Sequence, residues 1–217
     1  MQRQILMVAV ALAALLITGC KPFWGPTVKE EAPSAEELYK KAEALYKDKD
    51  YDAAIETYQR LKSGHSEFEK APEVYMRIAD AYYDSGKLEK AASEYLQFVE
   101  LYPGNEKVPR ANFRVAMCYF KQIKSTDRDS RAVTVAAERF KALRDNPDAG
   151  EWAKKASEKY DECLKKLAEK ELYKAQTYIS MGKYKAARMA AKRVLEEYGK
   201  LGLDREAEDL IKSIKGK

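Results

Sequence analysis

The distribution of apolar and polar residues divides the chain into two parts. Residues 5–18 form an apolar run of 14 residues, preceded by a single positive charge at Arg3. A helix that crosses a membrane needs about 20 apolar residues, so this shorter run is typical of the central region of a secretory signal peptide. From residue 34 onward, apolar positions are interspersed with polar ones in a pattern that recurs along the chain.

The recurring pattern has a period of 37 residues and predicts pairs of helices. Residues 39–61 align with residues 76–98 without a gap, and Ala42, Ala79 and Ala116 occupy the same position in three successive copies. Small residues at such positions allow two helices to approach closely. This is the tetratricopeptide pattern, so we expect an all-α superhelix of four to five helix pairs. An unrelated helical bundle is the alternative.

The predicted organisation is a signal peptide at residues 1–19, a tether at 20–33 and a repeat domain at 34–217. The tether contains three prolines and has no helical period. The stretch KQIKSTDRDS interrupts the third repeat and adds about eight residues, and the first helix of the fourth repeat is longer than one repeat needs. We expect repeats at about 35–68, 72–105, 109–147 and 151–198 and a terminal helix at 204–215.

The sequence ITGC (17–20) follows the apolar run in place of the usual small-x-small cleavage pattern. It resembles the bacterial lipobox, which implies cleavage before Cys20 and lipid attachment to that residue. Lys21 follows, where Asp would imply retention at the inner membrane, so the resemblance implies sorting to the outer membrane. A plain signal peptide with an incidental cysteine is the alternative. Phe23 and Trp24 are expected at the lipid interface or against the repeat domain.

Composition excludes several classes of function. The formal charge of +5 arises from 40 basic and 35 acidic residues that are mixed throughout, which is unlike a nucleic-acid footprint. Three cysteines without a CxxC pair and a single histidine argue against a zinc site and against acid–base catalysis. We therefore expect no enzyme, no metal and no cofactor apart from the lipid on Cys20. Cys118 and Cys163 are expected in helices as small hydrophobic residues, with a disulfide as the alternative.

The first helices of stacked pairs line a concave surface, which gives the candidate peptide-binding residues. Tyr46, Tyr83 and Phe120 form an aromatic row, one per repeat, and Glu43 and Asp80 belong to the same surface. Aromatic and methionine side chains make an adaptable lining for peptides. The alternative is that these side chains pack between helices as core. The groove candidates are Tyr39, Tyr46, Met76, Tyr83, Phe113, Met117 and Phe120.

A basic face is predicted on the last repeat. Lys185, Arg188 and Lys192 follow the helical spacing i, i+3 and i+7, and Arg193 lies beside them. This face is a candidate for docking an acidic partner domain, and a solvated face is the alternative.

The interrupting stretch offers two further interpretations. Asp129 or Ser130 can cap the helix that follows. Asp127 and Asp129 can in principle bind a cation, although two carboxylates on a loop are weak evidence for such a site.

The lipobox, the tether and the repeat array together resemble the family of D-type lipoproteins of the outer-membrane β-barrel assembly machinery, the BamD family. Two stretches sharpen the resemblance. One is the interrupted third repeat, in which DRDS (127–130) precedes AAERFKALRDNPDA (136–149). The other is residues 163–198, in which a long helix runs into a repeat with the pattern Y…G-x-Y-x-A.

The resemblance implies a scaffold of five repeats, lipid-anchored at the periplasmic face of the outer membrane. In that family the first repeats are thought to receive segments of unfolded outer-membrane proteins, which commonly end in an aromatic residue. The later repeats bind the periplasmic domains of the central β-barrel assembly protein. Here the aromatic row fits the first role and the basic face fits the second. Only one short helix follows Tyr198, so the fifth repeat is incomplete and any partner contact made there is in doubt.

Two other functions compete with this one. The first is another lipid-anchored periplasmic repeat protein, such as a pilus-secretin pilotin or a Tol-associated cell-envelope coordinator. The interrupted third repeat and the long helix of the fourth argue against it. The second is an enzyme, which the absence of a phosphate-binding glycine loop and of metal-ligand spacing in the sequence argues against.

Overall fold

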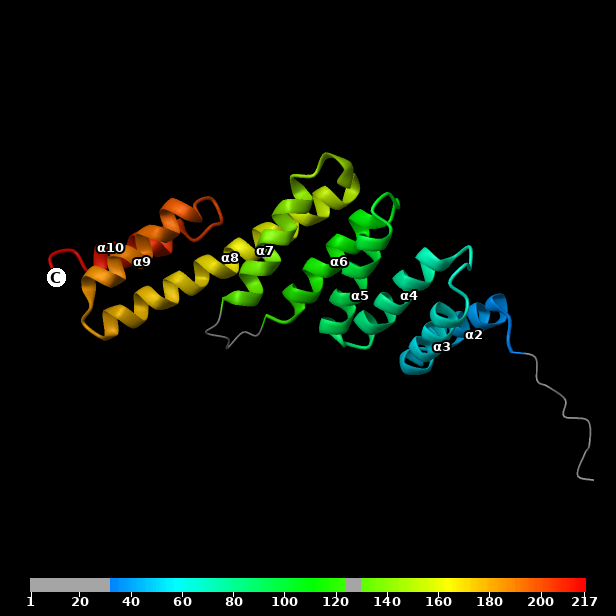
Figure 1. The fold of residues 1–217 in the computed structure, drawn as a ribbon. Helices are drawn as coiled ribbons and strands as arrows, with labels where there is room; N and C mark the ends of the chain where they lie inside the picture. The colour runs from blue at the N-terminus through cyan, green and yellow to red at the C-terminus, as the bar shows by residue number, and fades with distance from the viewer. Residues whose placement is uncertain (1–31, 124–129) are drawn as a thin grey trace, which may run out of the picture. The chain divides into compact units, whose positions relative to one another are not determined.

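The computed structural model describes residues 32–123 and 130–217, and Figure 1 shows the helices in chain order. These residues form nine α-helices, one short 3-10 helix and no β-strand, which confirms the all-α tetratricopeptide fold. The first three helix pairs are α2 (Ala35–Lys47) with α3 (Tyr51–Gly64), α4 (Ala71–Asp84) with α5 (Leu88–Leu101), and α6 (Val108–Lys121) with α7 (Arg131–Arg144). The 3-10 helix Pro147–Ala149 leads to α8 (Glu151–Ser180), which pairs with α9 (Tyr184–Glu197), and α10 (Asp204–Ser213) follows.

The helices begin and end where local chemistry favours it. Ser34 and Glu37 form a reciprocal capping box at the start of α2, so two backbone N–H groups that lack a partner within the helix are satisfied. Proline lies in the first turn of both α4 and α6, where its missing N–H costs nothing. The turn between α4 and α5 contains Gly86 at φ +77°, and the equivalent turn between α2 and α3 contains Lys49 at φ +63°.

Each pair packs against the next in chain order. The second helix of one pair contacts the first helix of the following pair, as α3 contacts α4, α5 contacts α6 and α7 contacts α8. Ala42, Ala79 and Ala116 are fully buried, so the small residues that defined the period do lie at close helix contacts. Tyr58 and Tyr95, one in each of the first two second helices, are also fully buried.

Helix α8 spans 30 residues, about twice the length of its neighbours, and contributes to separate cores. Its N-terminal half, through Ala156 and Cys163, packs with residues of α6 and α7. Its C-terminal half, through Ala168 and Leu172, packs with α9 and α10. Helix α10 therefore covers the end of the array as a single helix, the arrangement of a capping element.

Several predicted features lie outside the described residues: the signal peptide, the lipid-bearing Cys20, Phe23 and Trp24, and the loop carboxylates Asp127 and Asp129. Ser130 does stand at the N-cap position of α7, but its side chain makes no capping hydrogen bond there. Across residues 32–123 and 130–217, no helix is both long and apolar enough to cross a membrane.

Candidate functional site

The first helices of the four pairs bring aromatic rings and cations together in a repeating arrangement. Each ring of the predicted aromatic row has a cation from the next first helix over its face, at 4.1 to 5.3 Å from the ring centre. At these distances the positive charge is attracted by the electron-rich face of the ring. We call this set the aromatic–cation row: Tyr46 with Arg77, Tyr83 with Arg114 and Lys121, and Phe120 with Lys159.

The spacing of these pairs follows the sequence repeat. Tyr46 precedes Arg77 by 31 residues, and Tyr83 precedes Arg114 by the same number. Phe120 precedes Lys159 by 39 residues, because the insertion in the third repeat adds eight. The cations were missed in the sequence analysis, although Arg77 and Arg114 recur at the 37-residue period and so carried the signal.

The exposure of the groove candidates differs along the row. Tyr46 and Phe120 are half-buried, so each retains surface that a ligand can reach. Tyr83 is only 5% exposed and Met76 only 2%, so for these two the structure favours the alternative interpretation, packing as core. Their helical positions cannot distinguish a groove from a contact between helices, which is why the pattern placed them with the others.

The remaining candidates are half-buried and pack against the hydrophobic cores: Tyr39, Phe113 and Met117. The Tyr39 ring lies 5.8 Å from the Phe68 ring, between centres, and burial raises the pKa of its hydroxyl to about 12. The Phe113 ring lies 5.3 Å from that of Trp152 at the start of α8. The rings of Tyr39 and Phe113 are thus each oriented by contact with another aromatic ring.

Behind the first pair of the row lies a polar cluster that joins three helices. Glu43 of α2 accepts a hydrogen bond from the Tyr58 hydroxyl of α3, and Arg77 Nη2 of α4 donates to Glu43 Oε2 at 2.9 Å. Burial, followed by the bond to Glu43, raises the pKa of Tyr58 above its ordinary range, so the hydroxyl remains a donor. The Glu43 carboxylate therefore holds the Arg77 guanidinium in place over the Tyr46 ring.

A similar cluster recurs one period later and is more deeply buried, with the carboxylate and tyrosine at the repeated positions but the arginine four residues before the equivalent of Arg77. Asp80 is 6% exposed and accepts hydrogen bonds from the Tyr95 hydroxyl and from Arg110 Nη2, the latter at 2.8 Å to Oδ1 and 2.7 Å to Oδ2. Burial and the charge of Asp80 raise the pKa of Tyr95 above its ordinary range. A buried carboxylate is tolerated when it is paired and hydrogen-bonded, as here.

The third junction between pairs has no such cluster. Met117 stands where the period places the carboxylate, and Phe140 stands where it places the tyrosine once the insertion is counted. The Phe140 ring packs instead against Phe113 at 5.5 Å and Phe120 at 6.2 Å between ring centres. The third junction therefore lacks both the carboxylate and the tyrosine hydroxyl, so no polar group of this kind is buried there without its partner.

The predicted basic face on α9 is divided by the structure. Arg188 Nη2 donates to the backbone carbonyl of Ile214 at 3.2 Å, and Arg193 Nη1 lies 3.3 Å from Glu171 Oε2 of α8. Both arginines thus bind within the chain, although Arg193 remains exposed, as do Lys185 and Lys192.

The remaining candidates for chemistry are inert. Cys118 and Cys163 are buried and free, which rules out the alternative of a disulfide between them in this structure, and burial raises the pKa of each thiol to about 12. Among the described residues, no group of three His, Cys, Asp or Glu side chains is placed to hold a metal ion.

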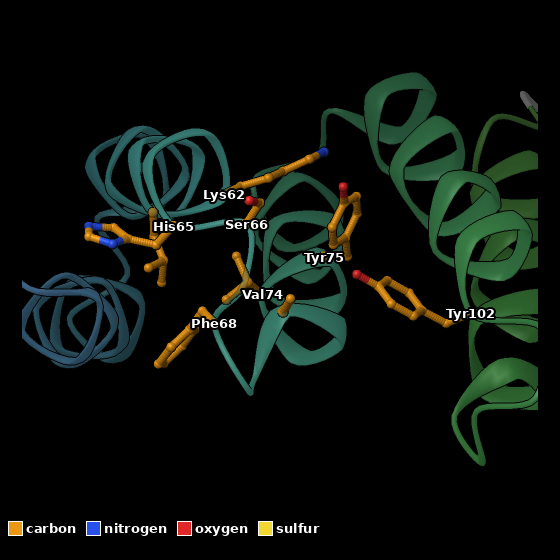
Figure 2. A pocket seen from close by; sticks show the side chains of 9 residues that line it. Lys62, His65, Ser66, Phe68, Val74, Tyr75 and Tyr102 are labelled. Carbon is orange, nitrogen blue, oxygen red and sulfur yellow. The ribbon is translucent and has the colours of Figure 1, made fainter.

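One small cavity of about 60 Å³ lies at the ends of α3, α4 and α5, near Lys62, Phe68, Tyr75 and Tyr102 (Figure 2). Lys62 Nζ lies 4.0 Å from the centre of the Tyr75 ring, so these two lining residues also contact each other. Pockets for small molecules are typically about 300–1,000 Å³. This cavity is therefore too small for such a ligand.

Comparison with known proteins points to one family. The family model YfiO, described as an outer membrane lipoprotein, matches residues 31–213. The outer membrane protein assembly factor BamD of Caulobacter vibrioides is 26% identical over 197 residues, which are 90% of this chain and 65% of that protein. BamD of Xylella fastidiosa is 27% identical over 203 residues, with 88% of this chain and 69% of that protein covered. The chain thus spans about two thirds of the length of these relatives.

Among solved structures, a thermophilic tetratricopeptide-repeat protein from Thermus thermophilus aligns with 83% of this chain and 98% of its own length. The TM-score of that alignment is 0.42 and the sequence identity is 19%.

Proposed function

The chain belongs to the YfiO family of outer membrane lipoproteins, and on that premise we propose that it is a non-enzymatic scaffold for the assembly of outer-membrane β-barrel proteins. Its curated relatives are named outer membrane protein assembly factors. The family match favours this role over a secretin pilotin or a Tol-associated coordinator. The chemistry of such a role is binding.

The client-binding surface in this proposal is the aromatic–cation row. Its half-buried rings, Tyr46 and Phe120, offer apolar contact to an aromatic side chain of an unfolded client. The cations over the rings, among them the exposed Lys121, attract a carboxylate such as the one that ends a chain. This combination of ring and cation, repeated from α2 to α8, is the observation that carries the proposal.

The partner in this proposal is the central β-barrel assembly protein, whose periplasmic domains dock on the C-terminal pairs. Lys185 and Lys192 are the exposed cations for that contact. The anchor is lipid on Cys20, which holds the protein at the periplasmic face of the outer membrane without any other cofactor. A single acyl chain gives only marginal membrane binding, so stable anchoring needs more than one.

Two experiments test these roles. Tagged chain is used to recover proteins from solubilised outer membranes, and recovery of the central assembly protein is expected. Recovery of a secretin or of Tol components in its place would overturn the scaffold assignment. For the anchor, Cys20→Ala is expected to leave the membrane fraction, since it removes the site of lipid attachment.

The groove is tested with a labelled client peptide that ends in phenylalanine. Lys121→Glu combined with Lys159→Glu is expected to weaken binding about tenfold, because two cations of the row become acids. Lys154→Glu makes the same change at an exposed position of α8 outside the row and is expected to bind as the parent does. Equal binding by all three proteins would contradict the assignment of the groove.

A further inference from the structure

The cations at the two ends of the aromatic–cation row are each neutralised by a carboxylate of the chain. At the first position of the row, Arg77 Nη2 donates to Glu43 Oε2 at 2.9 Å. At the last position, Lys159 Nζ lies 2.6 Å from Glu162 Oε1. Neither end of the row therefore offers an excess of positive charge to a ligand.

The two cations at the middle of the row have no such partner. Arg114 and Lys121 both lie over the Tyr83 ring, with Arg114 Cζ at 4.4 Å and Lys121 Nζ at 4.1 Å from its centre. The two charged groups are therefore at most 8.5 Å apart. Neither forms an ion pair with a carboxylate in the described parts of the chain. Two like charges held this close repel each other, and a bound anion removes that cost.

Arg114 is left without a carboxylate because another arginine binds the one at the repeated position. Asp80 stands one period after Glu43. Both of its oxygens accept hydrogen bonds from Arg110, at 2.8 and 2.7 Å, so Asp80 does not pair with Arg114. The first repeat has no equivalent of Arg110, because Glu73 stands at that position. Replacement of an acid by a base at this one position thus frees the arginine over Tyr83.

A second replacement of the same kind supplies the lysine. Lys121 stands one period after Asp84. Asp84 accepts a hydrogen bond from the Tyr46 hydroxyl, so the first ring has an acid beside it where the second ring has a base. Both replacements exchange an acid for a base, so the surroundings of Tyr83 are far more positive than those of Tyr46.

We propose that Arg114 and Lys121 bind the terminal carboxylate of an unfolded client at the middle of the row. Each oxygen of a carboxylate accepts charge-assisted hydrogen bonds of about 2.7–2.9 Å, so one carboxylate can contact both cations. The half-buried rings of Tyr46 and Phe120 belong to the helix pairs on either side, where the aromatic side chain of the client can pack. The inference rests on the proposed client-binding role of the row, and it adds the position and the chemistry of the anion.

The test compares two fluorescein-labelled client peptides that differ only at their last atom group. One ends in phenylalanine with a free carboxylate, and the other ends in phenylalanine amide. The dissociation constant of each is measured by fluorescence anisotropy with the full chain in detergent. The parent is expected to bind the amide at least about tenfold more weakly than the acid. In the double variant Arg114→Gln with Lys121→Gln, the ratio of the two constants is expected to fall to about one, because neither peptide end then meets a cation.

Single variants supply the controls. Lys121→Gln changes only an exposed side chain, so it tests the site even if the double variant fails to fold, and it is expected to lower the ratio about threefold. Lys47→Gln is the matched control, because Lys47 is exposed, stands two periods before Lys121 and lies over no aromatic ring within residues 32–123 and 130–217. Lys47→Gln and Lys159→Gln are both expected to keep the ratio of the parent.

The outcomes separate this inference from the client groove on which it rests. Equal binding of acid and amide by the parent would overturn the inference and leave the groove in place. A ratio that stays unchanged in both Lys121→Gln and the double variant would overturn it as well, because the carboxylate would then bind elsewhere. An amide peptide that regains full binding when glutamate precedes its phenylalanine would assign the site to side-chain carboxylates instead. Failure of both peptides to bind the parent would overturn the groove, and the inference with it.

Discussion

Successive helix pairs pack together at three junctions. The first two junctions contain a hydrogen-bonded polar cluster, and the third contains packed aromatic rings. At the second junction, Asp80 joins Tyr95 and Arg110 in a buried hydrogen-bonded cluster. At the third, Met117 and Phe140 stand at the corresponding positions and the contact is made by aromatic rings. The difference shows that the carboxylate and the hydroxyl behave as one unit, since either one alone would be left buried without its partner.

The comparison also separates stability from function. The aromatic–cation row continues across all three junctions, while the buried carboxylate stops after the second. A cation can therefore be held over a ring with or without a carboxylate beneath it. This favours the row, and not the cluster, as the feature on which binding depends.

The largest expected effect is at the aromatic junction. Phe140→Ala removes a fully buried ring that contacts Phe113 and Phe120, and we expect the free energy of unfolding to fall by about 3–5 kcal/mol. Urea unfolding followed by circular dichroism measures this change. Phe140→Leu keeps most of the volume and should cost less than about 1.5 kcal/mol. Equal losses for both variants would show that buried volume alone does not seal the junction and that the aromatic ring itself is required.

The second-largest effect is expected when the polar cluster of the second junction is replaced by the residue types of the third. Asp80→Met leaves the Tyr95 hydroxyl and the Arg110 cation without their acceptor, and we expect a loss of about 3 kcal/mol in the free energy of unfolding. Adding Tyr95→Phe should recover part of that loss, because the buried hydroxyl is removed with its partner. If the double variant is less stable than Asp80→Met alone, the carboxylate and hydroxyl do not act as a unit.

A smaller effect is expected at the turns within the first two pairs, which differ in the residue that adopts the left-handed conformation. Lys49 adopts φ +63° at the position that Gly86 occupies in the next repeat. The left-handed conformation costs a residue with a side chain about 1–2 kcal/mol, so Lys49→Gly should raise the free energy of unfolding by about 1 kcal/mol. Gly86→Ala, with open space around the added methyl group but the same φ problem, should lower it by a similar amount. Thermal unfolding of both variants is the measurement.

The smallest effect concerns the row itself. Phe120 corresponds to Tyr46 without its hydroxyl, and the Tyr46 hydroxyl donates to the exposed Asp84 at 2.5 Å. Tyr46→Phe should cost only about 0.5 kcal/mol in the free energy of unfolding, because an exposed hydrogen bond is replaced by water. Tyr46→Leu also removes the ring under Arg77 and should cost about 0.5–1 kcal/mol more. A larger loss for Tyr46→Phe than for Tyr46→Leu would contradict a role for the ring.

The fold could be predicted from the sequence because small, aromatic and turn-forming residues recur at the repeat period. It could not separate groove from core, since Tyr83 lies on the predicted face and is nevertheless covered by Arg114 and Lys121 of the next pair. It also could not show that Arg188 and Arg193 bind within the chain, because their partners, Ile214 and Glu171, lie 26 and 22 residues away. Such contacts depend on how helices pack, and helical periodicity contains no information about them.

The length of α8 has a consequence for the cooperativity of the molecule. One continuous helix of 30 residues, about 45 Å long, passes from the core of the third pair to that of the fourth. In most repeat arrays, one unit can unfold by breaking its contacts with the neighbouring unit. Here the third and fourth pairs share one helix, so one of them can open alone only if α8 unwinds from that end. Local opening should therefore divide α8 near Leu167, with amide hydrogen exchange rates that follow two different units along the same helix.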